Sequence, residues 1–153
     1  MIRHAVKEDS DAVVAMMPRA NLAAGFGPDG LVPLNLSEAR KALLFDQHLA
    51  CRDACLIVYA PNEKPEGFLM AALFAHPFDP VHRIAKDTAW WIEDGCRGRL
   101  SIVNAMLDAY EDWARARGCT YAGMAVMTAN LRVGKIYDRR GYVPAETHYL
   151  KKL

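Results

Sequence analysis

Two glycines and two arginines stand together where the chain is expected to turn from a strand into a helix. Residues 93–99 read EDGCRGR, so Gly95 and Gly98 flank a Cys-Arg pair. Unpaired N–H groups and the helix dipole at a helix N-terminus attract anions, and Arg97 and Arg99 would add charge-assisted hydrogen bonds to a phosphate. The segment predicts a phosphate-binding turn, and from these residues alone a solvated basic turn is an equally good interpretation.

A second group of residues that could do chemistry lies in residues 130–142. Val133, Ile136 and Tyr137 share one face of a short predicted helix, and Gly141 is placed to end it. A phenol can donate a proton in catalysis. By spacing alone, however, Tyr137 is more typical of a core aromatic residue, so both interpretations stay open at this point.

The clearest periodic pattern belongs to a longer helix between these two groups, predicted over residues 99–117 and ended by Gly118. Strands are expected on either side of it, over 88–92 and 120–127. A strand, a helix covering the sheet and a second strand imply parallel pairing. The buried stripe of the helix consists of Val103, Met106, Leu107, Tyr110, Trp113 and Ala114.

The first half of the chain has the pattern of antiparallel strands. Two apolar runs, 54–60 and 68–74, are joined by a turn containing Pro and Gly, which predicts a hairpin buried on both faces. The fold class is therefore α/β, with a mixed sheet of six to seven strands and about four helices in one domain, 1–153. The other expected elements are a strand at 2–6, a helix stopped at Pro18, loops at 19–36 and 75–86, and helices at 37–50 and 131–139. A final strand is expected at 142–150.

The composition excludes several classes of function. Nineteen Lys and Arg against eighteen Asp and Glu give a formal net charge of +1, so no overall field attracts nucleic acid or an anionic membrane. The cysteines and histidines lack metal-ligand spacing, and Cys51 and Cys55 are expected on one face of a sheet. No apolar run reaches the roughly 18 residues that cross a bilayer, and no signal-peptide core follows Met1. We expect a cytoplasmic protein without a metal.

Two motifs resemble those of the GNAT superfamily of acetyl-CoA-dependent N-acetyltransferases. Asn130, Tyr137 and the pair Gly141-Tyr142 reproduce the spacing of the family's N-x-x-A-x-x-x-Y-x-x-x-G-F/Y segment, with Val133 in place of the small residue. Residues 92–98 resemble the V-x-P-x-x-R-G stretch that leads into the family's pyrophosphate loop. The order and types of the predicted elements agree with the family along nearly the whole chain.

The resemblance implies acetyl-CoA as co-substrate. Its pyrophosphate would lie on the amides of 98–101, and its pantetheine arm would pair like a strand in a gap between 90–92 and 125–128. An N–H of Trp91 or Ile92 would stabilise the oxyanion. The family has glycine or alanine where this chain has Leu100 and Ile102, which puts tight cofactor binding in question. The implied cofactor-binding residues are Trp91, Ile92, Arg97, Gly98, Arg99, Leu100, Ser101, Asn130 and Tyr137.

The resemblance also implies catalytic roles. Tyr137 would be the general acid for the leaving thiolate, and Asn130 would cap the following helix and touch the cofactor. Glu93 is the first choice for the base that takes the proton of the amine, followed by Asp87 and His76. Trp90 and Trp91 would face opposite sides of their strand. Phe26, Phe78, His76 and His82, in the two long loops, would line an acceptor pocket.

The function expected from this resemblance is transfer of an acetyl group from acetyl-CoA to a primary amine, through a tetrahedral intermediate. The acceptor would be a small metabolite or a peptide amine, and family members are often homodimers. The glycine-poor loop motivates an alternative, an inactive GNAT-fold protein that senses acyl-CoA or binds a protein. A nucleic-acid or anion-binding module is a weaker third interpretation, because acidic residues are interleaved with the basic ones.

Overall fold

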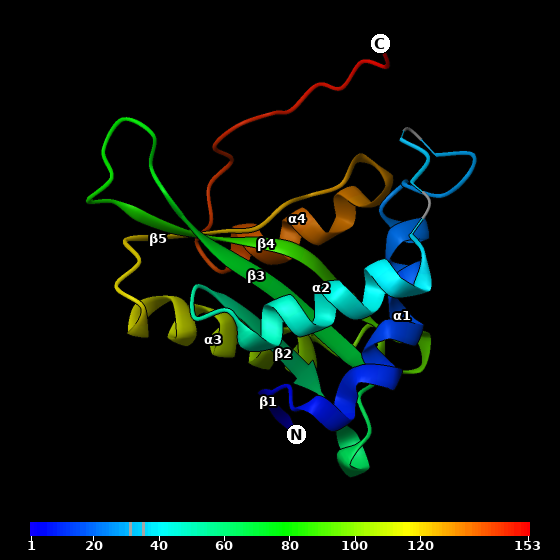
Figure 1. The fold of residues 1–153 in the computed structure, drawn as a ribbon. Coiled ribbons are helices and arrows are strands. Elements are labelled where there is room, and N and C mark those ends of the chain that lie inside the picture. Colours follow the sequence, from blue (N-terminus) through cyan, green and yellow to red (C-terminus); the bar gives the residue numbers. More distant parts are fainter. Residues whose placement is uncertain (31, 35) are drawn as a thin grey trace.

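A computed structural model describes residues 1–30, 32–34 and 36–153 of the chain (Figure 1). The strands are β1 (Ile2–His4), β2 (Ala54–Tyr59), β3 (Gly67–Ala75), β4 (Arg83–Ile92) and β5 (Tyr121–Gly123). The α-helices are α1 (Ser10–Ala23), α2 (Glu38–Ala50), α3 (Leu100–Ala116) and α4 (Gly134–Arg139). Short 3-10 turns are η1 (Lys7–Asp9), η2 (Pro61–Glu63), η3 (Asp94–Cys96) and η4 (Thr128–Val133).

The strands form one mixed sheet in the order β1-β2-β3-β4-β5. The first four strands are antiparallel to their neighbours, whereas β4 and β5 are parallel. Both predictions about strand pairing are confirmed: the runs around residues 54–60 and 68–74 form a hairpin, and the crossover through α3 joins two parallel strands. The α/β fold class follows directly from this pairing.

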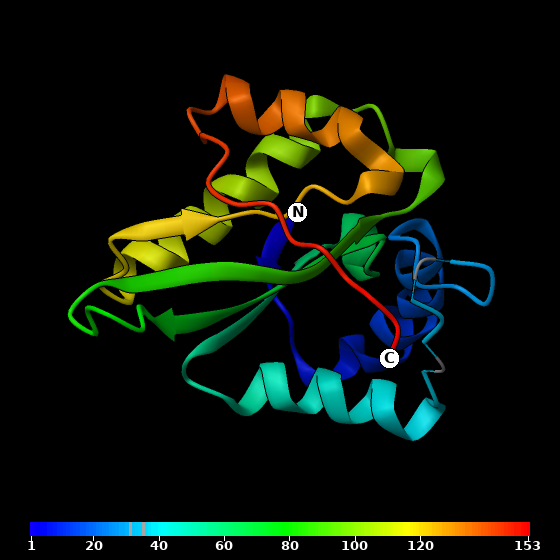
Figure 2. The same ribbon diagram turned by 90° about the horizontal axis from the view of Figure 1, so that it is seen from above.

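Helices cover both faces of the sheet, with α1 and α2 on one side and α3 and α4 on the other (Figure 2). Each side has its own apolar core. Trp90 packs against the core on the α3 side and Trp91 against the core on the α1 side, as strand alternation predicted. The predicted stripe of α3 is buried in full: Val103, Met106, Leu107, Tyr110, Trp113 and Ala114.

The predicted six or seven strands are corrected to five in the part of the chain that the structure describes. The chain from 143 onward contains no regular element, so the expected strand at 142–150 is absent, and β5 ends at Gly123 rather than near 127. After α4 the chain continues as an extended, exposed tail that runs away from the sheet and the helices (Figure 1). The backbone N–H and C=O groups of a strand need a neighbouring strand to pair with. Residues 143–150 do not run beside β5, so they form no strand.

Two further boundaries differ from the prediction. Helix α1 continues through Pro18 to Ala23, because Val13, Met16 and Met17 are buried against the sheet while Pro18 lies on the exposed face. There, water can reach the carbonyl that the proline leaves unpaired. Strand β4 begins at Arg83, inside the region predicted as a loop.

The cysteines at 51 and 55 do not share a face of the sheet. Cys51 is exposed and follows α2 as its C-cap, whereas Cys55 is buried in β2. The pairing of β2 begins only at Ala54, so Cys51 lies outside the strand pattern that was used to predict its orientation. Within the described parts of the chain, no helix combines the length and apolar character needed to cross a membrane.

Candidate active site

The central feature of the candidate site is an interruption in the pairing of β4. On one edge, β4 pairs with β3 as far as Ile92, opposite Gly67. On the other edge it pairs with β5 only through residues 84–86. In the described part of the chain, residues 88–92 therefore have a strand on one side alone. We call this interruption of the pairing between β4 and the segment that follows β5 the gap.

A β-bulge lies where this gap begins. Ala71 of β3 pairs with Asp87, and the next residue, Met70, pairs with Ala89, so Thr88 is the extra residue in β4. The hydroxyl of Thr88 contacts Nε2 of His48 in α2 at 3.2 Å. A bulge increases local twist and bends its strand. The bulge lies two residues beyond Lys86, where the pairing of β4 with β5 ends.

Tyr137 lies against the unpaired part of β4. Its ring centroid is 6.4 Å from that of Trp90 and 5.7 Å from that of Tyr142, and its side chain is 4% exposed. Its hydroxyl is buried without a hydrogen-bond partner among the described residues. Burial, together with the nearby Asp87 carboxylate, raises the pKa of Tyr137 above its ordinary value, although the neighbouring Trp90 side chain acts in the opposite direction. The phenol therefore stays protonated and has a hydrogen bond to give.

Asp87 is the titratable group in the gap. One oxygen of its carboxylate, Oδ1, accepts a hydrogen bond of 2.8 Å from the backbone N–H of Ala125. Burial raises the pKa of Asp87 to about 6, although the hydrogen bond from Ala125 acts in the opposite direction. Tyr110, Tyr137 and Tyr142 all lie close enough to Asp87 for its charge to raise their pKa values.

Ionic contacts hold α4 against α3. The guanidinium of Arg140, directly after α4, binds Asp108 at 2.6 Å and Glu111 at 2.8 Å. The hydroxyl of Tyr142 donates to the same Glu111 at 3.0 Å. Gly141 ends the helix with a φ of 85°, as its position in the sequence predicted. These contacts fix the helix that carries Tyr137.

We predict that Arg140→Ala lowers the free energy of unfolding by about 1–2 kcal/mol, because the half-buried Glu111 loses the less exposed of its two arginine partners. Thermal denaturation measures this loss. Arg115→Ala is the matched control, since Arg115 also binds Glu111, at 3.1 Å, but is far more exposed and such a pair contributes about 0–1 kcal/mol. Equal losses in both variants would show that Arg140 does not anchor α4.

The turn before α3 presents backbone donors to solvent. Within the described residues, no acceptor is found for the N–H groups of residues 98–101. Gly98 has a φ of 80°, a conformation that glycine adopts without strain. Leu100 is exposed, whereas the side chain of Ile102 is buried in the α3 core and so does not cover these amides. The arrangement can bind an anion.

Arg97 is engaged elsewhere. Its guanidinium carbon lies 3.9 Å from the centroid of the Trp91 ring, its Nε donates to the carbonyl of Ile92 at 3.0 Å, and its terminal nitrogen binds Asp94 at 2.7 Å. Arg99, the N-cap residue of α3, is exposed. Both arginines predicted to bind phosphate are exposed, but within the described residues only the guanidinium of Arg97 is engaged by neighbouring groups.

Glu93, the first choice for the base, forms an ion pair with Arg19 of α1 and accepts a hydrogen bond from the indole N–H of Trp91 at 3.2 Å. Burial opposes its ionisation, but the hydrogen bonds from Arg19 and Trp91 outweigh this effect and lower its pKa. A carboxylate held in its ionised form by an arginine accepts a proton poorly. Glu93 is therefore less suited to be the base than Asp87.

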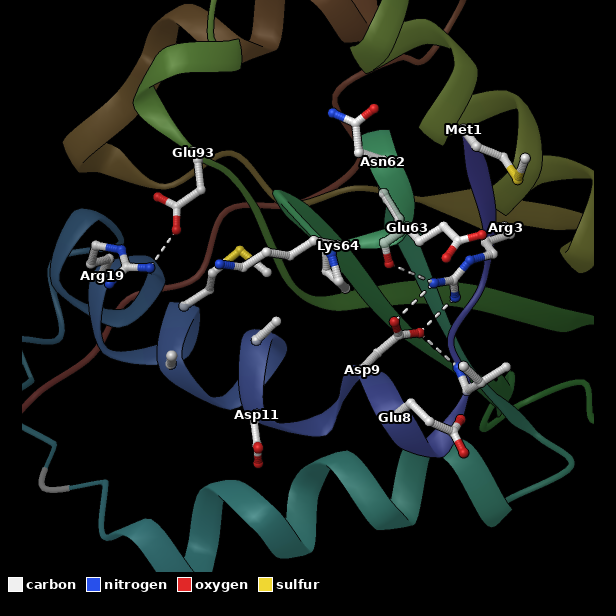
Figure 3. A pocket seen from close by; sticks show the side chains of 16 residues that line it. Met1, Arg3, Glu8, Asp9, Asp11, Arg19, Asn62, Glu63, Lys64 and Glu93 are labelled. Carbon is white, nitrogen blue, oxygen red and sulfur yellow. Dashed lines mark hydrogen bonds and ion pairs between the residues drawn. The ribbon is translucent and has the colours of Figure 1, made fainter.

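A cavity of about 1020 Å³ lies between α1, η2 and the end of β4, and Glu93 and Arg19 form part of its wall (Figure 3). Arg3 and Asp9 pair at another part of the same wall, at 2.6 Å and 2.9 Å. Neither Tyr137 nor the turn at 98–101 lines this cavity. It is thus distinct from the gap beside β4.

Several predicted site residues lie elsewhere. His76, Phe78 and His82 are at the tip of the β3–β4 hairpin, and β4 extends from that tip to Ile92. The unpaired part of β4 begins at Thr88, five extended residues or about 16 Å from Arg83. The structure therefore does not bring these three residues to Trp90 and Tyr137, and their place in an acceptor pocket stays a prediction. Phe26 is half-buried in the loop after α1. This loop runs close to η4, since a Cβ added at Gly25 would lie 3.8 Å from the Cβ of Ala129.

The sequence predicts that Asn130 caps the helix carrying Tyr137, but in the structure Asn130 does not cap α4. The helix begins at Gly134 with Val133 as its N-cap, and Asn130 lies earlier, within η4. The N–H of Asn130 donates to the carbonyl of Met127 at 2.8 Å, which closes a turn of its own. Arg19 was missed as a site residue because its segment was predicted as a loop, and its partner Glu93 is 74 positions away.

Comparison with solved structures identifies the fold, while no family model and no curated protein match the sequence. A predicted acetyltransferase from Clostridium acetobutylicum, solved with acetyl-CoA, is 17% identical with a TM-score of 0.78, covering 99% of this chain and 95% of that one. The aminoglycoside 6'-N-acetyltransferase AAC(6')-IG from Acinetobacter haemolyticus is 15% identical, TM-score 0.74, covering 100% and 99%. A ribosomal-protein-alanine N-acetyltransferase from Brucella melitensis biovar Abortus is 14% identical, TM-score 0.72, covering 100% and 99%. The chain has the GNAT fold.

Proposed function

We propose that this protein is an N-acetyltransferase that moves the acetyl group of acetyl-CoA to a primary amine by direct attack of the amine on the thioester. The observation that carries the proposal is the buried hydroxyl of Tyr137, which lies without a partner beside the unpaired stretch of β4. A buried hydroxyl that lacks a partner is costly. A sulfur atom bound in the gap would give this hydroxyl its acceptor.

The residues around the gap fit the two ends of acetyl-CoA. The exposed amides of 98–101 and the side chain of Arg99 would bind the pyrophosphate. The open edge of β4 at 88–92 would pair with the amide groups of the pantetheine arm, as a strand would. Acetyl-CoA supplies the activated acyl group. The residues of the chain would orient this acyl group and transfer the protons.

In the proposed reaction, Asp87 accepts the proton that the attacking nitrogen loses. Its contact with Ala125 uses only Oδ1, which leaves Oδ2 for the amine. Tyr137 donates its proton to the sulfur as the carbon–sulfur bond breaks. The tyrosinate then takes up the proton that Asp87 received from the nitrogen, so both side chains return to their starting forms and the net transfer is one proton from nitrogen to sulfur. An N–H of Trp91 or Ile92 would stabilise the oxyanion of the tetrahedral intermediate, since a preorganised donor is effective there.

The acceptor is proposed to be a primary amine of a small metabolite or a peptide. Two of the similar structures are named for such acceptors, an aminoglycoside and a ribosomal-protein alanine. The charge pattern does not favour a strongly cationic substrate, because the acidic residues directly after β4, Glu93 and Asp94, are paired with arginines. A homodimer remains a prediction of the family resemblance.

The proposal is tested by measuring free CoA released from acetyl-CoA in the presence of a panel of amines. Release that depends on the amine supports it. A parallel thermal-shift measurement separates the alternative: a sensor would be stabilised by acetyl-CoA, by about 2.7 kcal/mol at 100 times its dissociation constant, yet release no CoA with any amine. Absence of both release and stabilisation would contradict the enzyme and the sensor together.

We predict that Arg99→Ala raises the dissociation constant of acetyl-CoA about three- to tenfold, whereas Arg97→Ala changes it less than about threefold. The reason is that the guanidinium of Arg97 is occupied by Trp91, Ile92 and Asp94. Isothermal titration at low salt gives both values. Pantetheine, which lacks the pyrophosphate, should bind both variants as it binds the original protein. A larger effect of Arg97→Ala would mean that Arg97 leaves Trp91 when the cofactor binds.

A further inference from the structure

Asp87 lies at the one position where the pairing of β4 changes on both edges. Toward β3 it is the last paired residue before the bulge at Thr88. Toward β5 it directly follows Lys86, whose pairing with Gly123 is the last between the two strands. The residue that begins the gap is thus the same residue whose carboxylate points across it.

The contact of Asp87 replaces a missing strand contact. If the parallel register of β4 and β5 continued, in which Ile84 lies opposite Tyr121, then Thr88 would lie opposite Ala125. The backbone of β4 would then provide the acceptor for nearby N–H groups of that segment. Instead the N–H of Ala125 donates to Oδ1 of Asp87 at 2.8 Å. A side chain therefore does what a strand carbonyl does elsewhere in the ladder.

We propose that Asp87 is a positioning residue that holds the gap between β4 and β5 open for the pantetheine arm, by giving the Ala125 N–H an acceptor that is not the backbone of β4. Without this acceptor, the segment after β5 gains by pairing further along β4, which closes the gap. This role needs an oxygen atom at the end of a short side chain. It does not need a negative charge, so it is separable from the role of Asp87 as a base. The inference rests on the proposed function, because the proposed occupant of the gap is pantetheine.

The experiment compares Asp87→Asn with Asp87→Ala, using CoA and adenosine 3′,5′-bisphosphate, the nucleotide end of CoA without pantetheine. The amide oxygen of Asp87→Asn still accepts from Ala125, so its dissociation constant for CoA should stay within about threefold of the original value, whereas that of Asp87→Ala should rise about tenfold or more. Both variants should bind the bisphosphate equally, because it does not enter the gap. If both bind CoA like the original protein, or if Asp87→Ala loses the bisphosphate as well, the positioning role is wrong.

A second measurement covers the case in which Asp87→Ala does not fold. In the original protein and in Asp87→Asn, the amide hydrogen of Ala125 should be protected from exchange, and it should stay protected when CoA is bound. Exchange at the rate of an exposed amide would overturn the inference. If the original protein binds neither acetyl-CoA nor CoA, the proposed function fails first. If it binds them and the two substitutions have equal effects, the inference alone fails.

Discussion

Replacing Tyr137 with phenylalanine should lower turnover about 100-fold and leave the dissociation constant of acetyl-CoA within about threefold, since general acid catalysis typically contributes 10²–10⁴ in rate. The same substitution should raise the free energy of unfolding by about 1 kcal/mol. The hydroxyl that it removes is buried without a partner among the described residues, and such a group costs stability. Single-turnover release of CoA and thermal denaturation measure the two effects.

Lower turnover together with higher stability distinguishes a catalytic residue from a structural one, because loss of a structural hydrogen bond lowers stability. Tyr142→Phe is the matched control: its hydroxyl donates to Glu111 at 3.0 Å, so its loss should destabilise the protein by about 1 kcal/mol and largely preserve turnover. Unchanged turnover in Tyr137→Phe would remove this residue from the mechanism. A loss of stability there would mean that its hydroxyl has a partner in solution.

The second large effect concerns the pH dependence of the reaction. A base must be ionised to act, and burial raises the pKa of Asp87 to about 6. Only the neutral form of the acceptor amine attacks, and its ordinary pKa is about 10.4. Its fraction therefore rises tenfold with each pH unit in the acid and neutral range, which gives log kcat/KM a slope of one. We therefore expect a slope of two below about pH 6 and a slope of one above it.

Asp87→Asn should abolish the change of slope near pH 6, which we call the break, and lower turnover about 100-fold at pH 7. Glu93→Gln is the control, because Glu93 is held by Arg19 and should contribute less than about threefold to turnover. The break would then persist in Glu93→Gln. If it disappears there and survives in Asp87→Asn, the base is Glu93, as the sequence first indicated.

The raised pKa of Asp87 also makes the free energy of unfolding depend on pH. The pKa of Asp87 is higher in the folded protein than its ordinary value of 3.8, so between about pH 4 and 6 the folded state binds more protons than the unfolded state. This group therefore favours folding most at acid pH, and its contribution is lost as the pH rises through 6. If Asp87 is the base, its active form at neutral pH is the form that stabilises the folded state less.

The sequence by itself determined the parts of this protein that depend on neighbours along the chain. The period of α3, the glycines at 118 and 141 and the two-sided apolar character of β2 and β3 are local signals, and the structure agrees with all of them. The strand–helix–strand order around α3 also determined a parallel pair. With the motif around Tyr137, these features predicted the GNAT fold.

Tertiary structure decided which side chains can act. Glu93 was chosen from its place in the chain, but Arg19, brought near by the packing of α1, holds it as an ion. Arg97 was expected to face a phosphate and instead stacks on Trp91. Asp87 gains its raised pKa from burial in a gap that exists only because β5 stops pairing. Charge states and contacts of this kind depend on distances between residues far apart in sequence, which local patterns do not encode.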